Sequence, residues 1–319
     1  MDDLRFWIIF NVFVLTMLVL DLYILNSKSK VVKIKEALAW SAFWIGLAGA
    51  FNLFVWYWKG EEPALKFLAG YLLEESLSVD NLFVFMLIFS FFKVPNEYQR
   101  KVLFWGIIGA LVLRALFILV GVELIHHFHI TMLILGGFLV YTGIRMLIPS
   151  DKEIDPKNNP IVKIVNKIMP VTRSYHGDSF FVKAKGIWFA TPLFIVVLVT
   201  ETTDVVFAMD SIPAILSITD DAFIVYTSNV FALLGLRSLY FALAGIMQLF
   251  HYLHYGLSFI LIFIGCKMMI KWKWDYEIPI EIALSVVGGI LILSILISIL
   301  LPKKDSVIPV AEKESEKVK

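Results

Sequence analysis

The chain has 319 residues, of which 59% are hydrophobic and 17% are charged, and its mean hydropathy is +0.82. Soluble globular domains are about half apolar and about a quarter charged, so this composition excludes an ordinary soluble domain. The net charge of +1 gives no reason to expect nucleic acid as a partner, and the single cysteine, Cys266, excludes an intrachain disulfide.

The hydrophobic residues gather in blocks of about 20 residues, the length that an α-helix needs to cross about 30 Å of hydrocarbon. The sequence therefore predicts an all-α fold, a polytopic transmembrane helical bundle of about nine helices. The expected spans are 6–25, 37–58, 64–92, 102–124, 130–148, 186–218, 222–249, 255–270 and 278–301.

These spans predict a division of the chain into six parts. They are two N-terminal helices (1–63), a first three-helix repeat (64–148), a cytoplasmic loop (149–185), a second three-helix repeat (186–271), a final helix (272–301) and a disordered cytoplasmic tail (302–319). The tail is expected to be disordered because it is charged and short of apolar residues.

The orientation in the membrane is predicted from the basic residues of the loops. Fourteen lysines and arginines lie in the odd-numbered loops, against five on the opposite side. Cytoplasmic loops carry the excess of positive charge, so the odd loops are expected in the cytoplasm. This places the N-terminus outside, the C-terminus inside, and the chain in the bacterial inner (cytoplasmic) membrane.

Two acidic stretches resemble each other and indicate an internal repeat. The first reads LLEESLSVDNLFVF over 72–85, and the second reads TETTDVVFAMDSIPAI over 200–215. Their alignment sets Glu74 on Asp204, Asp80 on Asp210 and Asn81 on Ser211.

Two further landmarks follow in the same order, because Arg114 aligns with Arg237 and Arg145 aligns with Lys267. Each repeat holds three helices, so the second copy enters the membrane from the opposite side. Such inverted repeats are common in secondary transporters.

The acidic residues of the two long spans are the candidates for chemistry. A carboxylate at mid-membrane costs roughly 3 kcal/mol, so these groups need a compensating role. Oxygen ligands suit hard divalent cations such as Mg²⁺, Mn²⁺ and Ca²⁺. The expected metal ligands are Glu74, Asp80, Asn81, Glu201, Asp204, Asp210 and Ser211.

Other interpretations of the carboxylates stay open at this point. The carboxylates would form fixed salt bridges with Arg114 and Arg237, or they would relay protons. The two arginines would either release the carboxylates when a cation arrives or hold them in a fixed salt bridge. Pro213, three residues after Asp210, favours a break in the helix there, which would free carbonyl oxygens as further ligands.

The sequence offers no signature of catalysis. It contains no phosphate-binding glycine loop, nucleophile elbow or HExxH motif, so the chain is not expected to be an enzyme or to hold a permanent cofactor. The expected partners are a divalent cation and the lipid bilayer, and the oligomeric state is not predicted.

Three long motifs resemble one known family. GYLLEESLSVDNLFVF, QRKVLFWGIIGALVLRALFI and ETTDVVFAMDSIPAILSITDDAFIVYTSNVFALLGLRSLYF look like the TerC family of integral membrane proteins, in particular its Alx-like branch. The resemblance covers about residues 5–300. The family's acidic motifs carry over to Glu74, Asp80 and Asn81 in the first copy, and to Glu201, Asp204, Asp210 and Ser211 in the second.

This resemblance implies nine helices and kinship with the LysE-type exporters. It also implies a role in Mn²⁺ export or metal homeostasis, while older family labels refer to tellurium resistance and to redox modulation. The favoured function is export of a divalent cation, with Mn²⁺ as the expected substrate. The alternatives are a membrane scaffold that supplies metal to other membrane or secreted proteins and a membrane-bound redox modulator.

Overall fold

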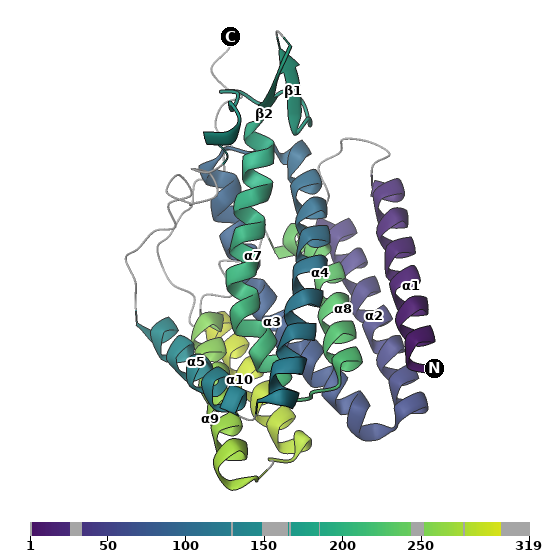
Figure 1. The fold of residues 1–319 in the computed structure, drawn as a ribbon, viewed down its shortest axis with the longest axis vertical. Helices are drawn as coiled ribbons and strands as arrows, with labels where there is room; N and C mark the ends of the chain where they lie inside the picture. The colour runs from purple at the N-terminus through teal and green to yellow at the C-terminus, as the bar shows by residue number, and fades with distance from the viewer. Residues whose placement is uncertain are drawn as a thin grey trace.

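A helical bundle is the main body of the protein (Figure 1). The structure is a computed structural model that describes residues 2–25, 34–128, 130–148, 165, 167–184, 186–243, 252–276 and 278–300. Its helices are α1 (Asp2–Leu25), α2 (Ile34–Lys59), α3 (Glu61–Phe91), α4 (Asn96–His127), α5 (Ile130–Leu147), α7 (Pro192–Leu216), α8 (Ala222–Leu243), α9 (Leu253–Trp274) and α10 (Ile280–Leu300). The predicted tail, 302–319, and residues 149–164 of the predicted loop 149–185 lie outside the described residues.

The helices confirm the predicted all-α, polytopic bundle. Within the described residues, seven helices are long and apolar enough to cross a membrane, and α1 has a shorter apolar stretch, Leu4–Leu20. Helix α3 is 31 residues long but is not among the seven, since it carries five acidic residues. The protein is therefore a multi-pass membrane protein whose third helix takes carboxylates into the bundle.

The predicted span 186–218 is wrong at its beginning. Residues Phe181–Ala184 (β1) and Ile187–Ala190 (β2) form an antiparallel hairpin, and α7 begins only at Pro192. Gly186 has a φ of +82°, which a glycine adopts without strain in the tight turn. Proline at the first helical position sets the beginning of α7. Hydropathy alone did not distinguish this apolar strand from a helix.

The expected break at Pro213 is also wrong. Helix α7 continues through Asp210 and Pro213 and ends at Leu216. The proline lies in the last turn, so few backbone hydrogen bonds beyond it are affected. Because proline has no N–H, the Met209 carbonyl four residues earlier loses its helical donor, but the helix is not interrupted and frees no run of carbonyls as cation ligands.

The first helices of the two repeats run in opposite directions, as the inverted repeat requires. At one end of the bundle Lys59, two residues before α3, pairs with Asp221, which follows α7, at 2.6 Å. At the other end the Tyr175 hydroxyl, from the segment before α7, donates to the Phe92 carbonyl that follows α3, at 2.9 Å. Burial raises the pKa of Tyr175 to about 12, so this phenol keeps its proton at neutral pH.

Helices α5 and α9 cross closely at two points that the repeat alignment exchanges. A Cβ placed on Gly265 would lie 2.5 Å from the carbonyl oxygen of Gly136, and one on Gly143 would lie 2.7 Å from the carbonyl oxygen of Ser258. The alignment that sets Arg145 on Lys267 also sets Gly143 on Gly265 and Gly136 on Ser258. The crossing therefore agrees with a pseudo-twofold axis, while the exact domain boundaries stay a prediction.

Helix α8 lies at the centre of the bundle. In its apolar window 83% of the residues are buried, compared with 44% for α4, its counterpart in the first repeat. It packs against α2, α3 and α4. The additional N-terminal helices therefore cover the second repeat's middle helix, and this helix carries polar groups into the best shielded part of the protein.

Candidate functional site

Four side chains from four helices meet in the interior. Arg114 of α4 donates from Nε and Nη2 to the two carboxylate oxygens of Asp204 on α7, at 3.2 and 3.0 Å. Its Nη1 forms an ion pair with Glu74 of α3 and donates to Oδ1 of Asn229 on α8, at 3.2 Å. Asn229 in turn donates from Nδ2 to Glu74 Oε2 at 3.0 Å. We call these four residues the carboxylate–arginine cluster.

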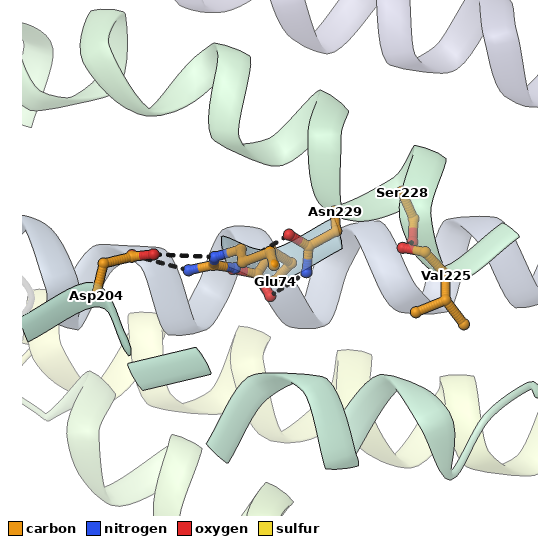
Figure 2. Close-up of polar contacts among 6 residues, drawn as sticks. Glu74, Asp204, Val225, Ser228 and Asn229 are labelled. Carbon is orange, nitrogen blue, oxygen red and sulfur yellow. Dashed lines mark hydrogen bonds and ion pairs between the residues drawn. The ribbon is translucent and has the colours of Figure 1, made fainter. Parts of the chain in front are cut away.

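The cluster is sealed from solvent. Glu74 is 0% exposed, Arg114 and Asn229 are each 1% exposed, and Asp204 is 3% exposed. In Figure 2 the Asp204 carboxylate points toward the pair formed by Glu74 and Asn229. Two carboxylates and one guanidinium leave a formal charge of −1 in a buried site, which favours a site for additional positive charge.

Small residues bring the helices close enough for these contacts. A Cβ on Gly70 of α3 would lie 2.9 Å from Ser228 Oγ on α8, one turn from the contact between Glu74 and Asn229. Ser228 is directed back to its own helix, where it donates to the Val225 carbonyl at 3.1 Å (Figure 2). This close packing of α3 on α8 sets the position of the buried amide.

The two carboxylates of the cluster are the pair that the repeat alignment exchanges. Glu74 and Asp204 occupy equivalent positions on α3 and α7, and Arg114 binds both. The predicted pairing of carboxylates with Arg114 is therefore present in this conformation, and it joins the two repeats. The arginine lies between the acidic groups that were expected to hold a cation.

Asn229 was missed by the sequence reasoning. It lies in an apolar helix between Ser228 and Val230, outside the two acidic motifs. The available signal was a carboxamide in a transmembrane segment, since such a group needs a hydrogen-bond partner in hydrocarbon. A carboxamide in such a helix predicts that a hydrogen-bond partner exists, but it does not identify Glu74 as that partner.

The other predicted ligands lie elsewhere along the same helices. Asp210 interacts with Thr142 and Arg145 of α5 rather than with the cluster, because six residues of helix separate it from Asp204 by about 9 Å. Asn81 is buried further along α3. The side chain of Asp80 lies outside the part of the chain that the structure describes.

Several buried oxygens near the cluster have no hydrogen-bond partner among the described residues. Glu201 lies one turn before Asp204, and its carboxylate packs against Gly109 of α4. The atoms without a partner include Glu75 Oε2, Ser78 Oγ, Thr200 Oγ1 and Glu201 Oε2. Ser211 Oγ also has no partner among the described residues, but it lies about two turns beyond Asp204 on α7. Buried polar atoms are almost always satisfied, so unsatisfied oxygens of this kind mark a place for a cation, a proton or water.

Arg237, the counterpart of Arg114, does not occupy an equivalent place in the cluster. It is 7% exposed and lines a small cavity together with Asp204 and Thr200. The free volume of about 10 Å³ approaches that of one water molecule. The two predicted arginines therefore differ, since Arg114 fills the centre of the cluster and Arg237 lines a small cavity beside Asp204.

The described residues contain no group of three or more histidine, cysteine, aspartate or glutamate side chains arranged to hold a metal ion. In the described geometry the guanidinium of Arg114 separates Glu74 from Asp204. A cation that bound both carboxylates would have to displace this guanidinium.

Comparison with known proteins identifies the family. The sequence model of the integral membrane protein TerC family matches residues 59–306. The chain belongs to the TerC family. The matched segment contains the whole carboxylate–arginine cluster, so the cluster lies within the part of the chain that defines TerC membership.

Related proteins match this TerC chain over nearly all of its length. An uncharacterized membrane protein of Myxococcus xanthus is 45% identical over 313 residues, which cover 98% of this chain and 96% of the relative. An Escherichia coli K12 protein named "Putative membrane-bound redox modulator Alx" is 42% identical over 301 residues, covering 92% and 93%. No solved structure matches the chain.

Proposed function

We propose that this TerC protein is a secondary transporter that exports a divalent cation, Mn²⁺ in the favoured case, from the cytoplasm across the bacterial inner membrane. The observation that carries the proposal is the position of Arg114 between Glu74 and Asp204, which the sequence alignment sets at equivalent positions of the two predicted repeats. In this proposal the chain moves a cation and catalyses no reaction.

In this proposal the Arg114 guanidinium occupies the place of the transported ion while no ion is bound. Its charge compensates the two carboxylates while the site is empty. When a divalent cation arrives, the carboxylates and the Asn229 carbonyl oxygen bind the ion, and the guanidinium withdraws. Oxygen donors of this kind suit Mn²⁺, Mg²⁺ and Ca²⁺.

The remaining predicted ligands define a route in this proposal. Glu201 lies one turn from Asp204 on α7, and Asp210 lies further along the same helix toward α5. With Asp80, Asn81 and Ser211 these groups would hand the ion along α3 and α7. Movement of one repeat against the other would then open the route to each side in turn.

Intracellular manganese tests this function. Cells that overproduce the wild-type protein should hold less Mn²⁺ under manganese load than cells that overproduce Glu74→Gln or Asp204→Asn. Glu97→Gln, an exposed carboxylate at the beginning of α4, is the matched control and should behave as wild type. Equal manganese in wild-type and Glu74→Gln cells, at equal protein levels, would contradict the role of the cluster.

A redox role is the second candidate, because the Escherichia coli relative is named a redox modulator. Thiol chemistry would have to use Cys266, which is exposed on α9. Cys266→Ser distinguishes the two functions, since it should leave manganese export unchanged and would abolish a thiol-dependent activity. A metal-supplying scaffold would instead move no cation across a liposome membrane.

A further inference from the structure

The small cavity beside Asp204 is lined by two polar residues that the proposed function leaves without a role. They are Thr200 of α7 and Arg237 of α8. The wall also includes Ala110 of α4 and Leu233 of α8, which the repeat alignment exchanges with each other. A wall formed by two exchanged residues lies close to the pseudo-twofold axis, so the cavity belongs to the region where the two predicted repeats meet.

The repeat alignment relates this cavity to the carboxylate–arginine cluster. It exchanges Asp204 with Glu74 and Arg237 with Arg114. On the side of the first repeat the carboxylate and the arginine are in contact, since Arg114 and Glu74 form an ion pair. On the side of the second repeat the corresponding two residues line one cavity, whose free volume of about 10 Å³ approaches that of one water molecule. The cavity is thus the counterpart of a contact that the first repeat already makes.

The polar group next to the carboxylate comes from a different helix on each side. On the first side the α8 position is Asn229, which donates to Glu74 (Figure 2), and the α3 position one turn before Glu74 is Gly70. On the second side the equivalent α4 position is Gly106, and the equivalent α7 position is Thr200. A Cβ placed on Gly106 would lie 3.6 Å from Cγ2 of Thr200, so these two positions are neighbours. A hydroxyl group on α7 therefore corresponds to the carboxamide on α8.

The Thr200 hydroxyl is buried without a hydrogen-bond partner among the described residues. The residue is 1% exposed, and Oγ1 is the atom that lacks a partner. It lies one turn before Asp204 on α7 and lines the same cavity. In this conformation both carboxylate oxygens of Asp204 accept hydrogen bonds from Arg114. Buried hydroxyls are usually satisfied, so a second arrangement in which Thr200 donates to Asp204 accounts for its position.

Two inverted repeats in different arrangements imply a second conformation, in which the repeats exchange these arrangements and the site opens to the other side. We propose that Arg237 replaces Arg114 between the two carboxylates in this second conformation. The Thr200 hydroxyl then donates to Asp204, in the role that Asn229 has here. The inference rests on the proposed transport function and adds to it the way in which the empty site returns. Arg237 has contacts of its own in this conformation, so its movement exchanges one set of contacts for another.

The exchange makes Arg237 necessary for only one step of transport. When the site holds a divalent cation, the ion itself compensates the carboxylates, and no arginine is required between them. When the empty site reorients, an arginine is required in each conformation, because buried carboxylates without a counter-charge are costly. Arg114 serves the conformation described here, and Arg237 serves the other. Loss of Arg237 should therefore slow the return of the empty site more than the movement of the loaded site.

Two flux measurements on proteoliposomes separate these steps. Net uptake of labelled Mn²⁺ into vesicles without manganese requires return of the empty site. Exchange of external labelled Mn²⁺ for unlabelled Mn²⁺ inside the vesicles requires only movement of the loaded site. The readout is the ratio of net uptake to exchange. A merely structural defect, which lowers the amount of active protein, leaves this ratio unchanged.

Two variants should lower this ratio. Arg237→Gln should lower it about 100-fold or more, because the second conformation then buries two carboxylates without a counter-charge. Thr200→Val should lower it about tenfold, the loss expected for one hydrogen bond to a charged group. Valine keeps the shape of the side chain and removes an unsatisfied hydroxyl, so this variant should fold as well as the wild type. Ser41→Ala is the control, since it removes a buried hydroxyl of α2 that lies outside both predicted repeats, and it should keep the wild-type ratio.

A wild-type ratio in Thr200→Val would overturn the proposal, whether or not Arg237→Gln yields folded protein. Loss of net uptake and exchange by the same factor in Arg237→Gln would also overturn it, since the arginine would then have a structural role. Both results leave the transport function itself in place. Absence of net uptake and of exchange in wild-type vesicles would instead contradict the transport function, and the exchange of arginines with it.

Discussion

Arg114 is the residue that joins the two halves of the candidate site. Its guanidinium pairs with Glu74 from one repeat and Asp204 from the other, and all three side chains are buried. Each charge in such a buried group offsets part of the desolvation cost of its partners, so removal of one partner leaves an uncompensated buried charge. Removal of one partner should therefore lower the stability of the protein more than removal of all three charges together.

Arg114→Met should destabilise the protein by about 3–5 kcal/mol, because two buried carboxylates lose their counter-charge. The triple variant Arg114→Met, Glu74→Gln, Asp204→Asn should recover most of this loss. Thermal unfolding of the purified proteins in detergent measures both effects. A single variant as stable as wild type would show that the ion pairs are not formed in solution.

Asn229→Leu should lower the apparent affinity for Mn²⁺ about 10- to 100-fold, as expected for loss of a group that orients a metal ligand. The reason is that Glu74 Oε2 loses the donor that fixes the carboxylate. Ser228→Ala is the neighbouring control, since its hydroxyl donates only to its own helix. Transport rates measured against Mn²⁺ concentration would show the change, and equal affinities would remove Asn229 from the site.

The sequence predicted which residues belong to the cluster better than it predicted the contacts between them. The repeat alignment paired Glu74 with Asp204 because both are charged in apolar helices. It did not predict that Arg114 would bind both, because two equivalent arginines are present and only packing distinguishes them. Asn229 was missed because a single carboxamide has no motif around it.

At the scale of elements, helix α7 shows what hydropathy can and cannot predict. The apolar run was recognised, but the strand Ile187–Ala190 was assigned to the helix, since apolar residues fit both structures. Pro213 was given too much weight, because a proline in the last turn ends a helix more often than it breaks one. Each error lies at an end of the helix, where hydropathy gives the least information about secondary structure.

The crossing of α5 and α9 yields a prediction about packing. Gly265→Ala should lower the thermal unfolding temperature, since the added Cβ would lie 2.5 Å from the Gly136 carbonyl oxygen and the two backbones would have to separate. Gly137→Ala, one residue along α5, is the control because no atom lies within 4 Å of its Cβ position. Equal unfolding temperatures for the two variants would contradict the close crossing.

At the scale of the whole molecule, α3 and α7 run in opposite directions, as expected for repeats related by a pseudo-twofold axis in the membrane plane. The ion pair between Lys59 and Asp221 marks one end, and the contact between Tyr175 and Phe92 marks the other. Loop charges predict that the second end faces the cytoplasm. The opposite directions of α3 and α7 agree with the predicted repeat, whereas the additional burial of α8 was not predicted, since it depends on how α2 packs.

The orientation can be tested by thiol labelling. In a Cys266→Ser background, Asp220→Cys should react with a membrane-impermeant thiol reagent on intact cells, and Asp178→Cys should react only after the cells are opened. Both positions are well exposed, with 61% and 68% of their side chains accessible. The reverse pattern would contradict the predicted topology.

Flux of Mn²⁺ into proteoliposomes tests the central proposal most directly. Vesicles that contain the wild-type protein and a manganese-quenched dye should lose fluorescence on addition of Mn²⁺. Vesicles with Glu97→Gln should respond in the same way, and vesicles with folded Glu74→Gln should match empty vesicles. Equal flux through wild-type and Glu74→Gln protein, or no flux through either, would contradict a cation pathway through the carboxylate–arginine cluster.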